Sequence, residues 1–290
     1  MSKKIVLIGV NGQVGQYLQS SLSAIGLDVV GLSRQELDLT MTDEIEEILD
    51  QIQPDMIINA SAYTAVDKAE SEPRLAHVVN AIAPQAMAEY AKKANIAIIH
   101  FSTDYVFAGD AVRPYLETDE TNPQGVYGAS KLAGEQAILA TGAKAFIFRT
   151  AWVYSQKGHN FFKTMLKLAE SRTELNVVND QVGSPTSAAA IAEATMKIVQ
   201  KIMTGRDFPL GVYHMTCQDQ THWAEFAQVI FALHDRQVTV NGIPSTEYPT
   251  PAQRPSFSVL DNQKLVDVFA VRLPHWREAL RACVKEGKNR

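Results

Sequence analysis

The chain has 290 residues, 46% hydrophobic and 20% charged, a balance typical of a globular protein with a large core. Its 27 lysines and arginines against 32 aspartates and glutamates give a formal charge of −5, which argues against nucleic acid as a partner. Cys217 and Cys283 form no Cys-x-x-Cys motif, so neither a disulfide framework nor a zinc site is indicated. No apolar run reaches the roughly 18 residues of a membrane span, and we expect a cytoplasmic protein.

Short apolar runs alternate with segments of helical period through the first 150 residues. This alternation is typical of βαβ units that build a parallel sheet covered by helices on both faces. It predicts an α/β fold with a doubly wound, Rossmann-like parallel sheet. The predicted strands are Ile5–Ile8, Val29–Leu32, Met56–Asn59, Ala97–Phe101 and Ala145–Phe148, and the predicted helices are Gln13–Ala24, Asp43–Ile52 and Glu72–Ala94, the last either single or kinked at Pro84.

The alternation loosens after Thr150. Residues 241–258 carry four prolines, which indicates a substrate-facing loop or a linker. We expect residues 1–150 to form a dinucleotide-binding domain and residues 151–290 a smaller, interleaved substrate lobe, with 175–203 returning to the first domain. The elements predicted here are strands at Leu175–Val178 and Gly211–Met215 and helices at Ala188–Met203, His222–His234 and Leu273–Cys283.

A glycine-rich loop joins the first predicted strand to the first predicted helix. Glycine permits a tight turn and close approach of a pyrophosphate, and the free N–H groups of the helix start bind the anion. The loop therefore predicts dinucleotide binding, although glycines that serve only packing would look the same. Its residues are Gly9, Val10, Asn11, Gly12, Gln13, Val14 and Gly15.

The residues at the end of the second strand indicate whether a Rossmann-like protein prefers NADH or NADPH. In NAD-binding proteins an acid about 20 residues after the glycines commonly binds the ribose there. The sequence there is Leu32-Ser33-Arg34. A hydroxyl and a guanidinium suit a 2′-phosphate, so the segment favours NADPH through Arg34. The nearby acids Glu36 and Asp38 keep NADH possible, and a solvated Arg34 is the alternative.

Tyr127 and Lys131 lie four residues apart, on one face of a predicted helix. A phenol of pKa about 10 acts as a general acid or base near neutrality only if its surroundings lower that pKa, as a nearby ammonium does. The strand Ala97–Phe101 ends in Ser102-Thr103-Asp104, at the sheet edge where such folds bind ligands. A hydroxyl there could hold a carbonyl, whereas the alternative makes these residues only turn formers.

These and other segments resemble the extended short-chain dehydrogenase/reductase superfamily, and within it the dTDP-4-dehydrorhamnose reductase family. The resemblance covers almost the whole chain. Its segments are Gly9–Gly15, Asn59–Glu70, Phe101–Phe107, Tyr127–Lys131, Arg149–Tyr154 and Asp180–Thr186.

The resemblance implies reduction of the C4 ketone of a dTDP-6-deoxy-L-lyxo-4-hexulose, giving dTDP-L-rhamnose for cell-surface polysaccharide. It implies that Tyr127 donates a proton to the C4 oxygen. Lys131 would bind the nicotinamide ribose and lower the pKa of that phenol, and Thr103 would bind the carbonyl in place of the superfamily's usual serine.

Other positions take roles from the same resemblance. Trp152 could instead be a core residue, and Arg254 an exposed, solvated one. The assignments are Gly12, Gln13 and Val14 to the phosphate turn, Asp38 and Leu39 to the adenosine, Ala62, Tyr63 and Thr64 to the loop beneath the nicotinamide, Asp104 and Trp152 to the substrate, and Arg254 to its diphosphate.

Two departures from related enzymes narrow the prediction. Related 4,6-dehydratases carry an Asp-Glu pair after the threonine, whereas Tyr105 here follows Asp104, which disfavours dehydration. Epimerisation, and a regulatory subunit that only binds a nucleotide, remain alternatives. Some reductases of the family dimerise through magnesium held by acids where this chain has Gln16 and Ala188–Ala190, so we expect a monomer or a homodimer without a metal bridge.

The seven histidines show no metal-binding spacing, and no metal is predicted. His100 lies at a predicted strand end. We interpret it as a buried histidine satisfied by backbone groups.

Overall fold

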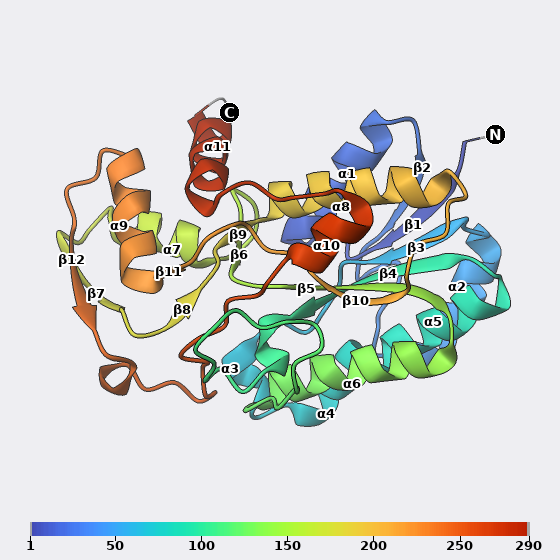
Figure 1. Ribbon diagram of the computed structural model, residues 1–290, viewed down its shortest axis with the longest axis horizontal. Coiled ribbons are helices and arrows are strands. Elements are labelled where there is room, and N and C mark those ends of the chain that lie inside the picture. The colour runs from blue at the N-terminus through green and yellow to red at the C-terminus, as the bar shows by residue number, and fades with distance from the viewer. Residues whose placement is uncertain (1, 289–290) are drawn as a thin grey trace.

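Six parallel strands form the central sheet of the computed structural model, which describes residues 2–288 (Figure 1). Their order is β10-β5-β4-β3-β1-β2, and each neighbouring pair is parallel. The predicted Rossmann-like parallel sheet is confirmed, with strand ends within two residues of the predicted ones. The strands are β1 (Lys4–Ile8), β2 (Asp28–Leu32), β3 (Met56–Asn59), β4 (Ala97–Thr103), β5 (Lys144–Thr150) and β10 (Gly211–His214).

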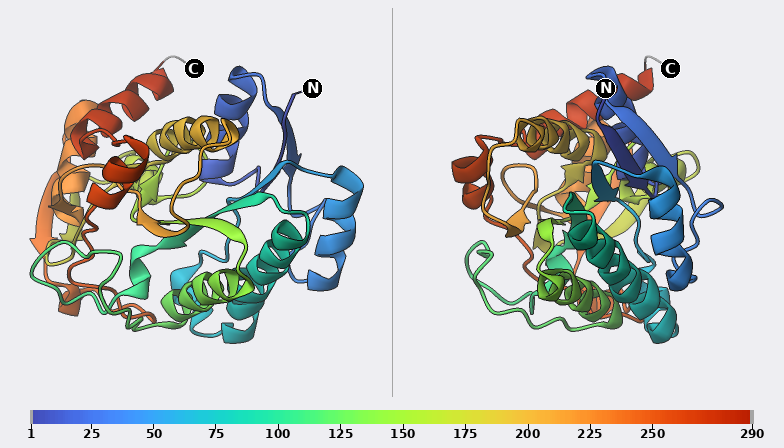
Figure 2. Two further views of the ribbon diagram at one scale, coloured as in Figure 1. Left: turned by 45° about the vertical axis from the view of Figure 1, so that its right-hand side comes forward. Right: turned by 90° about the vertical axis from the view of Figure 1, so that its right-hand side faces the viewer.

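Helices cover both faces of the sheet, because alternate strand residues point to opposite sides (Figure 2). Ile5 and Leu7 of β1 belong to one apolar cluster, whereas Val6 and Ile8 belong to another. The first cluster includes helices α1 (Gln13–Ala24) and α8 (Ala188–Met203), and the second includes α2 (Ile45–Ile52), α5 (Ala83–Lys93) and α6 (Val126–Thr141).

The segment predicted as one helix or a kinked pair over 72–94 contains a π-helical turn. Helix α4 (Pro73–His77) continues through the π-helical residues Val78–Ile82 into α5. Pro84 has no N–H to donate to the preceding turn, and the wider turn absorbs that loss without a break. The π-helical turn also brings Asn80 toward the sheet edge.

The C-terminal lobe consists of small sheets and helices, seen at the left of Figure 1. Its strand pairs are β7 (Glu174–Val178) with β12 (Thr239–Ile243), β8 (Val182–Gly183) with β11 (Thr221–His222), and β6 (Val153–Tyr154) with β9 (Thr186–Ser187). The remaining helices are α3 (Val66–Ala69), α7 (Phe161–Leu168), α9 (Trp223–Leu233), α10 (Gln263–Phe269) and α11 (Trp276–Lys288).

The expected return of residues 175–203 to the first domain is wrong for the strand part. Helix α8 packs against α1, but β7 pairs with β12 outside the central sheet. Alternate residues of β7 are buried, as Leu175 and Val177 are, so the strand suits a sheet with one open face. The sixth central strand is instead β10, from the part of the chain assigned to the smaller lobe. The boundary at residue 150 remains a prediction.

A buried ion pair fastens helix α6 to strand β5. The Nε and Nη2 atoms of Arg149 donate to the two carboxylate oxygens of Glu135 at 2.9 and 2.6 Å. Both side chains are under 5% exposed, and the hydroxyl of Ser102 also donates to Glu135. Because charges are strongly destabilising in a core unless paired, these three groups fix the register between α6, β4 and β5.

We predict that Arg149→Met lowers the free energy of unfolding by about 3–5 kcal/mol, because it leaves the Glu135 carboxylate buried without its partner. Urea denaturation measures this. The control Lys197→Met breaks an exposed pair with Glu193 and should cost about 0–1 kcal/mol. Adding Glu135→Leu to Arg149→Met should restore much of the loss. Equal effects of the two single variants would contradict the account.

Candidate active site

The glycine loop lies where the strand order reverses, between β1 and β3, which is where open α/β sheets bind ligands. Gly9 has φ of +83°, and a Cβ there would lie 2.7 Å from the backbone nitrogen of Ser61. A Cβ on Gly15 would lie 2.2 Å from the carbonyl oxygen of Gly9. These two glycines thus serve the turn and the close packing of helix against strand, as the motif requires.

The N-terminus of α1 offers main-chain donors. Gly12 is its N-cap and provides no side chain to cap the first N–H groups. The side-chain oxygen of Gln13 accepts hydrogen bonds from Ser155 and Asn160 at 2.9 and 2.7 Å. The side chain of Gln13 therefore binds the C-terminal lobe, and its backbone N–H remains available for an anion. The neighbouring Asn11 is exposed and Val14 is half-buried.

The predicted adenosine end follows β2. Arg34 is exposed, with its side chain 80% accessible and its Nε 3.4 Å from Asp38. Asp38 accepts hydrogen bonds from the backbone and hydroxyl of Thr40, which lower the pKa of its carboxyl. The hydroxyl of Ser33 is bound to Glu36, and Leu39 is buried. Arg34 is thus accessible to a phosphate group.

Asn80 makes buried contacts, which no motif indicated, with the loop predicted beneath the nicotinamide. Its side-chain oxygen accepts from the backbone N–H of Tyr63 at 2.8 Å, and its amide donates to the Tyr63 carbonyl at 3.1 Å. The same amide donates to Ser130 of α6 at 2.9 Å. Asn80 thereby fixes the loop Ala62–Thr64, predicted beneath the nicotinamide, against α6. A buried asparagine inside the apolar run 78–82 is the one signal that the sequence carries.

Tyr127 and Thr103 meet at the carboxyl end of β4. Thr103 is the last residue of β4 and accepts the backbone N–H of Tyr105 at 3.2 Å. Tyr127 lies in the first turn of α6, edge-on to the ring of Tyr105 with centroids 5.5 Å apart. The Thr103 side chain lies close enough to the Tyr127 phenol to act on its pKa. The structure therefore brings the predicted carbonyl-binding hydroxyl and proton donor together.

The expected lowering of the Tyr127 pKa is not produced by the protein's own groups. Burial raises the pKa of this phenol, and the nearby Thr103 side chain only partly opposes that rise. Lys131 does not reach the phenol, because its Nζ donates to the carbonyl of Phe101 at 2.7 Å and lies 3.0 Å from Nε2 of His100. Tyr127 consequently keeps its proton at neutral pH, as a proton donor must.

The interpretation of His100 as a partner of backbone groups is wrong. Its two ring nitrogens face side chains instead: Nδ1 lies 3.1 Å from the amide of Asn59, and Nε2 faces Lys131. Sequence alone missed these contacts, because the spacing of Lys131 points to Tyr127 and nothing in the sequence links His100 to Asn59 or Lys131.

Residues 3–289 of the 290-residue chain match the family model described as RmlD substrate binding domain. A dTDP-4-dehydrorhamnose reductase of Burkholderia thailandensis is 44% identical over 98% of both chains. The chain belongs to the dTDP-4-dehydrorhamnose reductase family.

Solved structures of this family share the fold. A dTDP-4-dehydrorhamnose reductase of Clostridium acetobutylicum superposes with a TM-score of 0.91 and 38% identity, covering 98% of this chain and 99% of that one. The enzyme of Bacillus anthracis, solved in complex with NADP, has a TM-score of 0.92 and 35% identity, covering 99% and 100%.

In this member of the reductase family, Trp152 stacks on another tryptophan. Its ring lies 3.5 Å from that of Trp223, nearly parallel at 6°. A Cβ on Gly183 would lie 2.5 Å from the Trp152 ring, so this glycine makes room for it. Trp152 is half-buried and has φ of +48°. One ring face is thus covered by Trp223, a neighbour that the sequence did not indicate.

Arg254 is paired rather than solvated. Its Nη2 lies 2.8 Å from the carboxylate of Asp67 in α3, and its Nη1 lies 3.5 Å from the hydroxyl of Tyr105. Burial raises the pKa of Tyr105 to about 12, with Arg254 acting against the rise. A phenol of this kind is a poor base at neutral pH, consistent with the expectation that dehydration is disfavoured.

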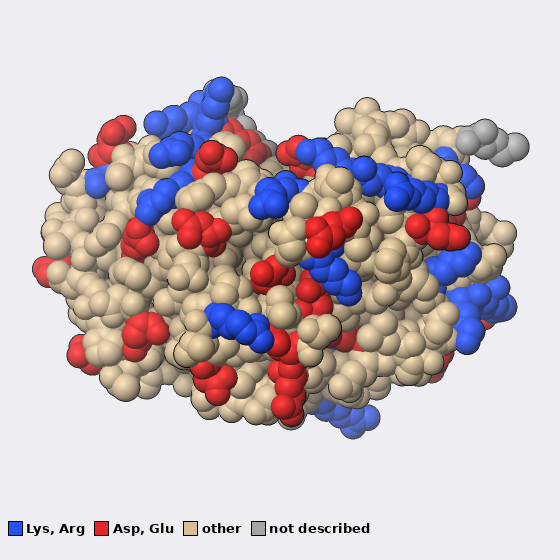
Figure 3. Space-filling model, viewed as in Figure 1, with Lys and Arg blue, Asp and Glu red and all other residues tan. Residues whose placement is uncertain are grey.

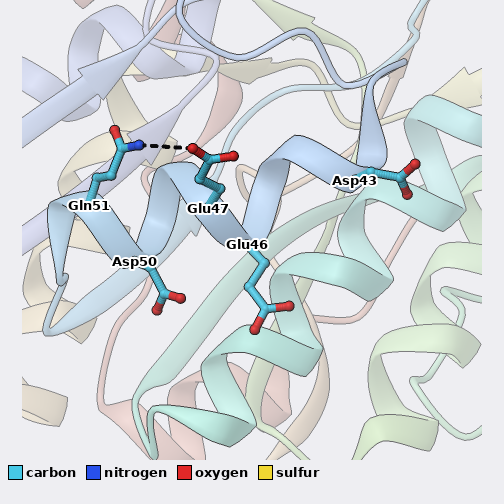
Figure 4. A pocket seen from close by; sticks show the side chains of 5 residues that line it. All are labelled: Asp43, Glu46, Glu47, Asp50 and Gln51. Atoms are coloured by element: carbon cyan, nitrogen blue, oxygen red, sulfur yellow. Dashed lines mark hydrogen bonds between the residues drawn. The ribbon is translucent and has the colours of Figure 1, made fainter.

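Lys and Arg side chains are interspersed with Asp and Glu side chains across the face shown in Figure 3. The hollow in Figure 4 is lined by side chains from the α2 region, including Asp43 and Glu46, and by none of the predicted site residues. Between residues 2 and 288, no cluster of His, Cys, Asp or Glu suits a metal ion, and no helix is long and apolar enough to cross a bilayer. The absence of a metal stays a prediction.

Asp104 is buried next to Thr103 and close to Tyr127, the predicted proton donor. Its Oδ1 accepts from the Thr103 hydroxyl at 3.0 Å, and within the described chain its Oδ2 has no hydrogen-bond partner. Burial raises the pKa of this carboxyl from 3.8 to about 6. Asp104, predicted on the substrate side, is therefore a carboxyl group that lacks a protein partner for one oxygen.

We predict that Asp104→Asn removes a pH-dependent loss of stability. The folded chain binds the Asp104 proton more tightly than the unfolded chain does. The contribution of this protonated carboxyl to the free energy of unfolding is therefore complete below pH 3.8 and is lost as pH rises through about 6. Between pH 4 and 8 the wild type should lose about 3 kcal/mol relative to the variant. Urea denaturation across this range tests it, with the exposed Asp207→Asn as control. A pH-independent difference would contradict it.

Proposed function

We propose that the chain reduces the C4 ketone of dTDP-4-dehydro-6-deoxy-L-mannose (dTDP-4-dehydrorhamnose) to dTDP-L-rhamnose, for cell-surface polysaccharide, with NADPH as preferred cofactor and NADH possible. The observation that carries this is the juxtaposition of Thr103 and Tyr127 at the carboxyl end of β4, with Lys131 buried one helical turn further along α6. Membership of the reductase family along almost the full chain supports it.

The residues present fit a dinucleotide. Cβ atoms on Gly9 and Gly15 would fill the turn, and the start of α1 has donors without a side-chain cap. The exposed Arg34 would hold a 2′-phosphate, and Lys131 the nicotinamide ribose. When bound, the cofactor supplies a hydride to C4 of the sugar. The NADP bound to the Bacillus anthracis relative supports the preference.

Tyr127 would supply the proton that the reduced C4 oxygen needs. Its buried phenol is protonated at neutral pH, and the Thr103 hydroxyl beside it can hold the carbonyl oxygen within reach. Proton transfer leaves a phenolate at Tyr127, and a charged Lys131 stabilises that anion. One hydride and one proton account for reduction of the ketone to an alcohol.

The substrate diphosphate would meet the guanidinium of Arg254, which Asp67 holds at the site. Trp152, supported from behind by Trp223, would offer its other face to the sugar. A pure nucleotide sensor has no need of the Thr103, Tyr127 and Lys131 set, so an enzyme is favoured over a regulatory subunit.

We also propose a cytoplasmic monomer or homodimer, without a metal bridge and without nucleic acid as a partner. Gln16 and Ala188–Ala190 provide no hard oxygen anions at the positions where some relatives hold magnesium.

Tyr127→Phe should lower kcat by about 10²- to 10⁴-fold with NADPH binding retained, because it removes the acid and leaves the pocket shape. The assay follows NADPH absorbance with the dTDP-4-keto-6-deoxy-L-sugar generated in situ. Cofactor binding is measured by fluorescence, and wild type should turn over faster with NADPH than with NADH. Tyr248→Phe, 61% exposed, is the control. No turnover by folded wild type with either cofactor would shift weight to another keto-sugar or to the regulatory alternative.

Opposite effects on KM are expected at the Asp67–Arg254 pair. Arg254→Gln should raise KM for the nucleotide sugar by about 10- to 100-fold with a small change in kcat, since a charged hydrogen bond to the diphosphate is lost. Asp67→Asn should lower it by about 2- to 5-fold, because the guanidinium no longer has to leave a carboxylate. The same direction for both variants would show that the pair is only structural.

A further inference from the structure

Lys131 is buried with partners that restrict its protonation. The side chain is 1% exposed. Its Nζ lies 2.7 Å from the carbonyl oxygen of Phe101, which can only accept, and 3.0 Å from Nε2 of His100. The direction of the second hydrogen bond depends on which His100 nitrogen carries the proton.

Asn59 settles that question through its own partners. Its side-chain oxygen accepts the backbone N–H of Ser61 at 3.0 Å and the Ser61 hydroxyl. A backbone N–H always donates, so the amide oxygen must face Ser61, and the NH₂ group must face His100. The NH₂ then donates to Nδ1 of His100 across 3.1 Å.

His100 therefore carries its single proton on Nε2. It is buried, and burial followed by the neighbouring Lys131 keeps the pKa of its ring well below 6.5, so the ring is neutral. With Nδ1 accepting from Asn59, Nε2–H points at Nζ of Lys131. An ammonium has no lone pair to accept this hydrogen, whereas a neutral amine accepts it and still donates to Phe101.

The surrounding charges do not supply a free counter-ion to the ammonium. Glu135, one helical turn further along α6, raises the pKa of Lys131, but its carboxylate is already paired with Arg149. Burial is the larger effect and lowers the pKa of Lys131 to about 8. The ionisable groups of the described chain near this end of α6 include Glu70, which accepts the backbone N–H of Val126, and the following residues: His100 of β4, Arg149 of β5, Asp104 and Tyr105 after β4, and Tyr127 and Glu135 of α6 itself.

We propose that Asn59 and His100 are positioning residues that set the hydrogen-bond polarity at Lys131 and favour its neutral amine in the free enzyme. The charge that stabilises the Tyr127 phenolate is then readily lost as pH rises. This consequence rests on the proposed function, whereas the polarity itself is a property of the cofactor-free protein.

The direct test is NMR on the cofactor-free full chain, labelled with ¹⁵N-histidine and ¹³C-lysine. His100 should show a protonated Nε2 and an unprotonated Nδ1 down to acidic pH, and Lys131 should titrate well below the other lysines. His77→Gln, at an exposed site on α4, is the control and should change neither signal. A protonated Nδ1 on His100, with Lys131 charged up to pH 10, would overturn the proposal.

Asn59→Asp should reverse the polarity. A carboxylate still accepts from Ser61 and now accepts from Nδ1–H, so Nε2 becomes an acceptor for the Lys131 ammonium. The Lys131 titration, and the alkaline limb of kcat/KM for NADPH, should move up by about one to two pH units.

His100→Gln provides a second variant that adds no charge and keeps the proposal testable if Asn59→Asp does not fold. Its side-chain oxygen can accept from Lys131, so the titration should again move upward. A purely structural role predicts lower stability or lower kcat with the titration and the alkaline limb unchanged, and that result would refute the proposal. Failure of the proposed sugar substrate would leave the NMR result intact and is therefore distinguishable.

Discussion

Burial of the Lys131 side chain is the constraint on which the rest of the site depends. A buried amine needs partners, and they come from β4: the Phe101 carbonyl and the His100 ring. Strand β4 must therefore run past α6 in one register, which carries Thr103 to the strand end beside Tyr127. The Glu135–Arg149 pair holds that register. Tyr127, the proposed proton donor, is thus positioned by buried interactions of α6 with β4 and β5.

The substrate side is assembled differently, from segments far apart in the chain. Arg254 comes from the proline-rich stretch and meets Asp67 of α3, while Trp152 follows β5 and stacks on Trp223 at the start of α9. The C-terminal lobe is tied back to the glycine loop by Gln13, whose side chain binds Ser155 and Asn160. These contacts couple the cofactor turn to the lobe that would select the sugar.

Local pattern was sufficient for the five central strands of the first 150 residues and for the glycine turn, because apolar alternation and the glycine turn are short-range signals. It failed where strands pair across long sequence separations. The apolar pattern of β7 predicts a strand but does not indicate that β12 is its partner. In the same way, nothing local indicates that β10 pairs with β5 in the central sheet. Local pattern also did not predict the contacts of Asn80 with Tyr63 and Ser130, or that the Lys131 side chain bonds to His100 and Phe101, since neither follows from residue spacing. Burial raises the pKa of Tyr127, and the lysine that was expected to lower it bonds to His100 and Phe101 instead.

The central claim is that hydride goes to the sugar ketone in a net reduction, and isotope transfer tests it most directly. Wild-type enzyme would be incubated with NADPH deuterated at the transferring position of nicotinamide C4 and with the dTDP-4-keto-6-deoxy-L-sugar. We predict one deuterium at C4 of the product sugar, with one cofactor oxidised for each sugar reduced. Sugar interconversion without net cofactor oxidation would indicate an epimerase, and an unchanged sugar with folded, cofactor-bound protein would contradict the account.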